Sequence, residues 1–173
     1  MNQFLTALIP NENYFSRKAF IEEESKIFQS TWSYIGLTSS LESNNDFITQ
    51  EIGGKSVVIQ NINGELKAFH NVCTHRFNKL KTEKQGNGAL TCPYHGWSYN
   101  KDGIPFGIPL KKEFQGLDKE SLKTLCLPEF KLEICGKFIF VNVSNGDLSL
   151  DDFLGNTAIK LKEISGMIGK KAE

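Results

Sequence analysis

Apolar and polar residues alternate through the middle of the chain with the short period of β-strands. The clearest stretches are rich in branched and aromatic residues and read FITQEI, KSVVIQNI and ELKAFHNV, at residues 47–52, 55–62 and 65–72. The dipeptides between them, Gly53-Gly54 and Asn63-Gly64, favour two-residue hairpin turns, because their residues tolerate a positive φ. The pattern predicts consecutive antiparallel hairpins.

Further strand-like segments flank these hairpins. WSYIGL precedes them, and FKLEI and KFIFVNV follow them on either side of Gly136. Asp102-Gly103 marks another turn, after WSYNK. We therefore expect a mainly β fold, an antiparallel sandwich or barrel over residues 41–155.

The first part of the chain has the period of a helix instead. Ser16 is suited to cap a helix that runs to about Thr31, in which three apolar residues share roughly one face: Phe20, Ile27 and Phe28. We expect residues 1–40 to form a helical lead-in that packs on the β domain.

A second helical pattern begins at residue 156. Leu161, Ile164 and Ile168 stand at positions i, i+3 and i+7, which places them on one helix face. We expect residues 156–173 to form a short amphipathic helical segment. Its apolar face can cover the core of this domain or pack on a further domain or chain.

Composition and charge narrow the classes of function. Lys and Arg number 20 and Asp and Glu number 20 among 173 residues, so nothing indicates a nucleic-acid partner. No apolar run approaches the roughly 20 residues that span a bilayer, so no membrane partner is expected. The N-terminus lacks the pattern of a secretory signal, and we expect a cytoplasmic protein.

The four cysteines and three histidines do not suggest a disulfide scaffold. Cys126 and Cys135 lie in strand-like surroundings and are expected to be buried free thiols. Cys73 and Cys92 each stand beside a histidine, which is the metal pattern of an intracellular protein.

The candidate metal ligands are Cys73, His75, Cys92 and His95. Thiolates together with imidazoles suit zinc, copper or iron–sulfur clusters. Zinc fingers group cysteines with cysteines and histidines with histidines. Here each segment offers one of each, which suits a pair of irons with two cysteines on one and two histidines on the other. A non-enzymatic zinc module in the same ligands stays open as an alternative.

The segments FHNVCTHR and CPYHGWSY resemble the signatures of the Rieske [2Fe–2S] domain. More narrowly, roughly residues 13–155 resemble the N-terminal part of the large subunits of Rieske non-haem iron ring-hydroxylating oxygenases. Respiratory Rieske proteins carry an additional cysteine in each loop, and these loops have none. The family commonly has glycine after the His-Arg pair, where this chain has Phe77.

The resemblance implies a Rieske-type β fold with a cluster-binding subdomain of two loops. It implies that Cys73 and Cys92 bind one iron of a [2Fe–2S] cluster and that His75 and His95 bind the other. It also implies an electron path from a ferredoxin or flavin reductase, through this cluster, to a mononuclear iron that activates O₂. Tyr94 and Trp97, which flank His95, would help to shield such a cluster from water.

The mononuclear iron site of these oxygenases needs two histidines and a carboxylate. Once His75 and His95 bind the cluster, only His70 remains, so we expect no such catalytic domain in this chain and assign no catalytic residue. Three interpretations stay open: a piece of an oxygenase large subunit, a stand-alone ferredoxin-like carrier, or a split subunit that works with a separate catalytic chain.

Basic residues gather beside the first ligand segment. We call the basic patch the set Arg76, Lys79, Lys81 and Lys84. In a chain of zero net charge, such a patch suits the docking of an acidic ferredoxin or reductase, and a merely solvated loop is the equal alternative.

Overall fold

The computed structural model describes residues 9–113, 116–144 and 146–169. The first eight residues of the expected lead-in and residues 170–173 of the expected C-terminal segment lie outside the described residues. Within the described ranges, no helix is long and apolar enough to cross a membrane.

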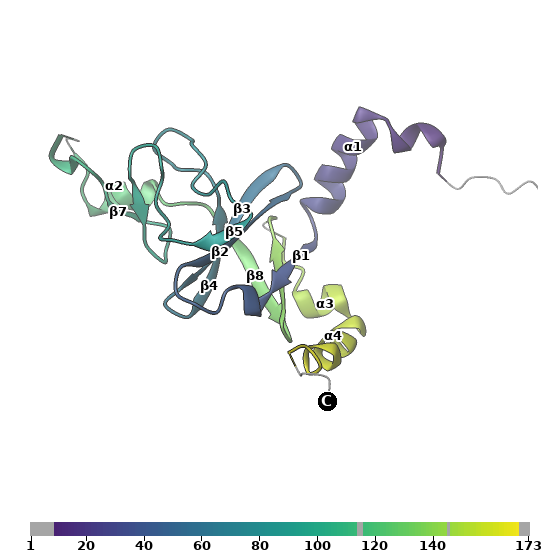
Figure 1. The fold of residues 1–173 in the computed structure, drawn as a ribbon. Helices are drawn as coiled ribbons and strands as arrows, with labels where there is room; N and C mark the ends of the chain where they lie inside the picture. The colour runs from purple at the N-terminus through teal and green to yellow at the C-terminus, as the bar shows by residue number, and fades with distance from the viewer. Residues whose placement is uncertain (1–8, 114–115, 145, 170–173) are drawn as a thin grey trace, which may run out of the picture.

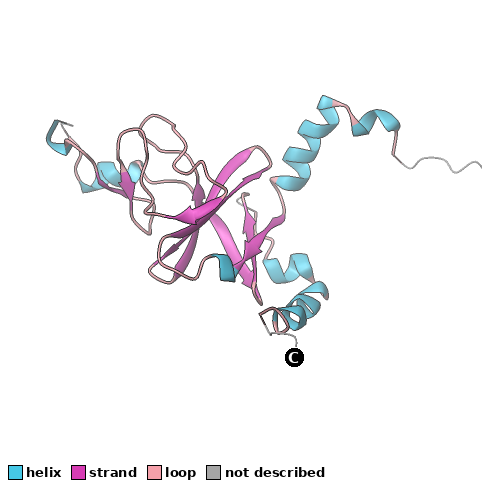
Figure 2. Ribbon diagram, in the orientation of Figure 1, coloured by secondary structure: helices cyan, strands magenta, loops and turns pink. Residues whose placement is uncertain are grey.

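Seven strands form one curled antiparallel sheet in the order β1-β9-β8-β4-β3-β2-β5 (Figures 1 and 2). The strands are β1 (Trp32–Leu37), β2 (Asp46–Ile52), β3 (Lys55–Ile62), β4 (Glu65–His70), β5 (Gln85–Asn87), β8 (Glu129–Cys135) and β9 (Phe138–Asn142). Two short strands pair separately: β6 (Ser98–Tyr99) and β7 (Pro105–Gly107). The predicted mainly β, antiparallel fold is confirmed.

The predicted turns have the backbone that their residues favour. The φ angles are 51° at Gly53, 74° at Gly54, 56° at Asn63 and 89° at Gly64. Positive φ at both central residues is the geometry of a tight hairpin turn whose twist matches that of the flanking strands. These two turns therefore fix how β2, β3 and β4 pair.

The central hairpin β3–β4 is buried on both faces and separates two hydrophobic cores. Val58 pairs with Phe69, and both enter the core that also contains the two candidate cysteine ligands. Their neighbours Val57, Ile59 and Ala68 enter a second core, shared with β9. Because successive strand residues point to opposite faces, a strand buried on both sides needs a continuous apolar run. The VVI sequence of β3 supplies it.

The helical elements lie outside this sheet. They are η1 (Asn11–Tyr14), α1 (Arg17–Glu23), the π-helical turn η2 (Glu24–Phe28), η3 (Thr38–Ser40), η4 (Lys111–Glu113), α2 (Lys119–Thr124), α3 (Leu150–Leu154) and α4 (Thr157–Ser165). Ser16 caps α1 as predicted, since its side chain accepts a hydrogen bond from the N–H of Ala19 at 3.3 Å.

The N-terminal helix is present, but the domain covers its predicted apolar face only in part. Phe20, Ile27 and Phe28 are 56%, 50% and 48% exposed, and α1 projects away from the sheet in Figure 1. The π-helical turn breaks the regular helical period between Phe20 and the other two. Contact with the domain comes at the end of the helix, where Gln29 Nε2 donates to the carbonyl of Gly53 at 2.6 Å.

The C-terminal helix is present as α4, and its buried face matches the predicted one only in part. Ser165 is buried and Leu161 half-buried, whereas Ile164 is 47% exposed. The Ser165 hydroxyl accepts the N–H of Lys137 at 2.8 Å and donates to the carbonyl of Leu161 at 2.8 Å. A Cβ at Gly136 would clash with Ser165. This close polar contact with the β8–β9 turn sets the rotation of the helix.

The two remaining cysteines differ. Cys135 is buried in β8, as predicted, but Cys126 is exposed, which corrects the expectation for that residue. Cys126 lies between α2 and β8, outside any strand. Its neighbour Leu127 is buried in the core, and Cys126 takes the outward position.

Candidate metal centre

Two loops carry the predicted ligands and repeat one backbone design. We call residues 72–79 the first loop and residues 91–98 the second loop. In each loop the cysteine stands second. Its N–H donates to the carbonyl five positions later at 2.8 Å, and its carbonyl accepts the N–H from four positions later. An isolated β-bridge joins the first and last residues of each loop. The two cysteines therefore occupy matching positions.

The position four residues after each cysteine has a left-handed backbone. The φ angle is 57° at Phe77 and 71° at Gly96. A Cβ on Gly96 would lie 3.1 Å from Cγ of Pro109, so glycine suits the second loop. In the first loop Phe77 holds the same backbone with a side chain that is 79% exposed. Phe77, which stands where the family commonly has glycine, therefore occupies a strained backbone position.

The cysteines lie inside and the histidines near the surface. Cys73 and Cys92 are 1% and 2% exposed and belong to the core beneath the loops. His75 and His95 are half-buried, with ring centroids 4.8 Å apart and planes at 64°. The structure thus brings both predicted cysteines into one core and both predicted histidines into contact.

Aromatic rings cover the histidines. Trp97, a buried residue of the second loop, stacks on His75 of the first loop, with centroids 4.7 Å apart and planes at 3°. Tyr94 tilts over His95 at 3.9 Å but is itself largely exposed. The pair from different loops, Trp97 on His75, joins the two loops through their side chains.

The protonation of His75 suits a metal ligand. Its Nδ1 atom is buried. Burial, and then the neighbouring His95 and Arg76, lower the pKa of His75 below its usual value. The ring is therefore neutral at pH 7, and neutral imidazole is the form that binds metals.

The arrangement of the four donors fits a pair of irons better than a single metal ion. Within the described ranges, no three His, Cys, Asp or Glu side chains converge as a group around one ion. A structural zinc site draws four ligands around a single ion. A Rieske-type cluster takes two cysteines on one iron and two histidines on the other. Two inner thiols and two outer imidazoles match the second arrangement.

Tyr99 is a residue of this site that the sequence analysis missed. Its hydroxyl lies 3.0 Å from Sγ of Cys73 and accepts the N–H of Thr74 at 3.1 Å. Burial, followed by the contact with Cys73, raises the pKa of Tyr99 above its usual range, so the phenol stays protonated. The available signal was a tyrosine in a strand directly after the second ligand segment.

The basic patch does not act as one surface. Lys79 forms an ion pair with Glu51 at 2.8 Å. Lys81 is half-buried and donates to two backbone carbonyls that precede the second loop. Arg76 and Lys84 are exposed.

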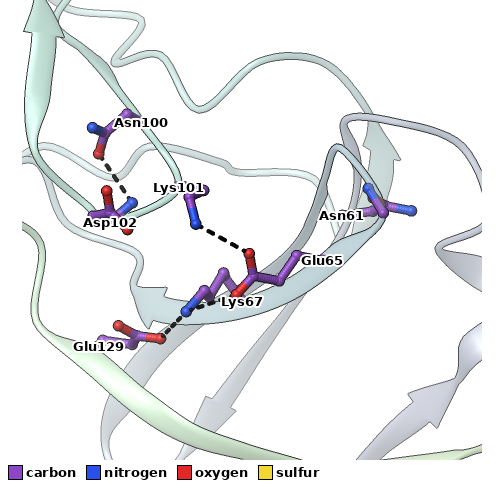
Figure 3. A network of polar contacts seen from close by, with 8 residues as sticks. Asn61, Glu65, Lys67, Asn100, Lys101, Asp102 and Glu129 are labelled. Carbon is purple, nitrogen blue, oxygen red and sulfur yellow. Dashed lines mark hydrogen bonds and ion pairs between the residues drawn. The ribbon is translucent and has the colours of Figure 1, made fainter.

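A network of ion pairs connects the turn after β6, which follows the second loop, to the sheet (Figure 3). Lys67 on β4 lies 3.2 Å from Glu65 and 3.0 Å from Glu129 of β8. Lys101, in the turn after β6, lies 3.5 Å from Glu65. Each exposed pair contributes little alone, but together they link three segments.

His70, the third histidine, lies apart from these ring contacts. It stands on β4, half-buried, with its ring edge-on to Phe130 at 6.2 Å between centroids. Burial, and then Lys55, lower its pKa. Its observed contacts are those of a structural residue.

Comparison with known proteins places this geometry in a family. The Rieske [2Fe-2S] domain matches residues 31–131. The glycine betaine monooxygenase oxygenase subunit of Chromohalobacter salexigens is 32% identical over 150 residues, which cover 84% of this chain and 32% of that protein.

Solved structures agree. The quaternary ammonium Rieske monooxygenase CntA, in complex with an inhibitor, has a TM-score of 0.79 at 28% identity and covers 90% of this chain and 43% of its own. Naphthalene 1,2-dioxygenase with indole bound has a TM-score of 0.76 at 28% identity and covers 86% and 34%. The chain thus spans less than half the length of each of these proteins. The domain match extends over more than half of the chain, so the chain belongs to the Rieske [2Fe–2S] domain family, and its cofactor is a Rieske-type [2Fe–2S] cluster.

Proposed function

We propose that Cys73 and Cys92 bind one iron of the cluster and that His75 and His95 bind the other. The observation that carries this proposal is the repeated loop design, in which each loop contributes one buried cysteine and one histidine near the surface. When bound, the cluster accepts and donates one electron at a time.

The surrounding residues prepare this site. Burial of both thiols keeps water from the sulfur ligands. Trp97 holds the His75 ring in one orientation by stacking on it. Tyr99 stays protonated and offers its hydroxyl proton toward Cys73. The histidine edge is the part of the site nearest to solvent, which makes it the side where an electron enters or leaves.

We further propose that the chain receives electrons from a ferredoxin or flavin reductase and passes them to a mononuclear iron on another domain or chain. Relatives that are named monooxygenases favour a monooxygenase system among the Rieske oxygenases that the sequence resembles. Their names also favour a quaternary ammonium compound as the substrate, which the domain with the mononuclear iron would bind. The cytoplasmic location stays a prediction.

A stand-alone electron carrier is the second candidate. Exposed apolar residues in the N-terminal helical segment and at the end of α4 favour the oxygenase component instead, since a further domain or chain would cover them. They are Phe20, Ile21, Ile27, Phe28, Ile164 and Met167.

Matched substitutions test the proposed ligands. Cys92→Ala should abolish binding of iron and acid-labile sulfide, whereas Cys126→Ala, at the exposed cysteine, should leave both unchanged. His95→Ala and His70→Ala form the equivalent histidine pair. A Cys92→Ala protein that keeps its full iron and sulfide content would refute the assignment.

A further inference from the structure

Lys81 bridges the two ends of the segment that connects the ligand loops, residues 80–90. Its Nζ donates to the carbonyl of Gly88 at 3.0 Å and to that of Ala89 at 2.7 Å. It also lies 4.6 Å from the centre of the Phe47 ring. An ammonium group turned onto backbone carbonyls and an aromatic face is held within its own domain. Its charge is therefore poorly placed to meet a docking partner.

The backbone of Lys81 is held just as firmly. Asn71 is 1% exposed. Its Oδ1 accepts the N–H of Lys81 at 2.9 Å, and its Nδ2 donates to the carbonyl of Lys81 at 2.7 Å. Asn71 lies just before Cys73, and Ala89 lies just before Cys92. A continuous path of hydrogen bonds therefore joins the base of the first loop to the base of the second through the Lys81 side chain.

The far end of this path is anchored to the sheet. The carbonyl of Gly88 accepts a second hydrogen bond, at 2.7 Å, from Nε2 of the buried Gln60 on β3. Without the ammonium group, Gly88 would keep its attachment to the sheet, and its hydrogen-bonded path to the first loop through Lys81 would be broken. The Lys81 contact is thus the part of the path that sets one loop relative to the other.

We infer that Lys81 is a positioning residue whose ammonium group fixes the separation of the two loops and so holds Cys73 and Cys92 ready for the cluster. We call the two hydrogen bonds from Nζ of Lys81 the clamp. The effect of the clamp on the cluster rests on the proposed ligands, whereas the clamp itself does not depend on them. The basic patch then divides into an inward member, Lys81, a member paired with Glu51, Lys79, and two outward members, Arg76 and Lys84.

Three variants of the full chain test the clamp. Lys81→Met keeps an unbranched apolar stem against Phe47 and removes the ammonium group, and Lys81→Arg keeps a charged donor. Lys84→Met is the matched control, because it removes an exposed lysine from the same segment. Hydrogen exchange is measured by mass spectrometry on the purified proteins, with residues 55–62 of the central hairpin as the reference for global folding. Loss of visible absorbance in EDTA reports on the cluster.

Lys81→Met should speed exchange in residues 88–99 about tenfold, the change that corresponds to one hydrogen bond from a charged donor. It should also speed cluster loss in EDTA by a similar factor. Lys84→Met should match wild type, and Lys81→Arg should restore most of the protection. Residues 55–62 should exchange alike in all four proteins.

Two outcomes overturn the clamp: exchange in Lys81→Met that equals that in Lys84→Met, or a Lys81→Arg protein as loose as Lys81→Met. If Lys81→Met fails to fold, Lys81→Arg and Lys84→Met decide instead: exchange in residues 88–99 of Lys81→Arg that is about tenfold faster than in Lys84→Met overturns the clamp. A loosened Lys81→Met segment in a protein whose wild type contains no iron or sulfide would support the clamp and refute the proposed function.

Discussion

The hydroxyl of Tyr99 lies 3.0 Å from Sγ of Cys73, and it also accepts the N–H of Thr74. A cysteine that binds iron is a thiolate and only accepts hydrogen bonds. Since its raised pKa keeps the phenol protonated, Tyr99 is the donor of this pair in the loaded protein. Such a bond withdraws negative charge from the sulfur and favours the reduced cluster.

Tyr99→Phe should therefore lower the reduction potential. Removal of one hydrogen bond of about 1 kcal/mol corresponds to roughly 40 mV for a one-electron couple. The potential is measured by a redox titration followed by circular dichroism. Tyr94→Phe, at the exposed tyrosine over His95, is the control and should leave the potential unchanged. Equal potentials in Tyr99→Phe and wild type would show that the hydroxyl does not act on the sulfur.

The left-handed positions of the two loops should respond oppositely to substitution. Phe77→Gly removes a strained backbone and an exposed ring, so we expect a gain of about 0.5–1 kcal/mol in the free energy of unfolding. Gly96→Ala adds a Cβ against Pro109 at a positive φ and should cost about 1–2 kcal/mol. Urea unfolding of both proteins measures the difference. A neutral Gly96→Ala would show that the second loop does not need glycine.

The outward members of the basic patch should control docking of an acidic donor. Arg76→Glu with Lys84→Glu should slow reduction by a plant-type ferredoxin about tenfold or more at low salt, because steering acts on the association rate. The effect should fade as ionic strength rises. Lys160→Glu, at an exposed residue of α4, is the control in stopped-flow measurements. A rate unchanged at low salt would remove docking from this patch.

The network around Lys67 should make part of the stability depend on pH. The hydrogen bond from Lys67 is the main cause that lowers the pKa of Glu65. A carboxyl with a lowered pKa stabilises the fold above its ordinary pKa, and this stability is lost as the pH falls through the folded value. Lys67→Met should thus be slightly less stable than wild type at pH 7. That difference should shrink below about pH 4, and also in high salt.

Urea unfolding at both pH values measures the two proteins. A difference between Lys67→Met and wild type that stays constant across this range would show that the Glu65 contact does not contribute. Lys123→Met, which removes an exposed ion pair with Glu120 on α2, serves as a control for the loss of a surface lysine.

Local patterns predicted the strands and turns well, because they depend on neighbours in sequence. The apolar run of β3 and the positive φ at Asn63 and Gly64 follow from residue type alone. The two segments that carry the candidate ligands could also be identified from the sequence, since Cys and His spacing is a local property. The exposure of the N-terminal helix could not be predicted, because the exposure of Phe20 depends on what lies opposite it in space.

The features that the sequence did not predict depend on contacts between distant or differently oriented groups. Ile164 faces outward because Ser165 bonds to the turn at Lys137. Lys81 had the charge of a docking residue, and only the fold shows its ammonium group turned onto backbone carbonyls. Tyr99 reaches Cys73 because β6 passes beneath the first loop, a relation that no spacing along the chain encodes.

The presence of a Rieske-type cluster is tested most directly by the iron and acid-labile sulfide content of the purified wild-type chain, measured together with the electron paramagnetic resonance spectrum after dithionite reduction. We expect two irons and two sulfides per chain, with the spectrum of a reduced cluster that has histidines on one iron. One zinc per chain, without sulfide and without colour, would contradict it.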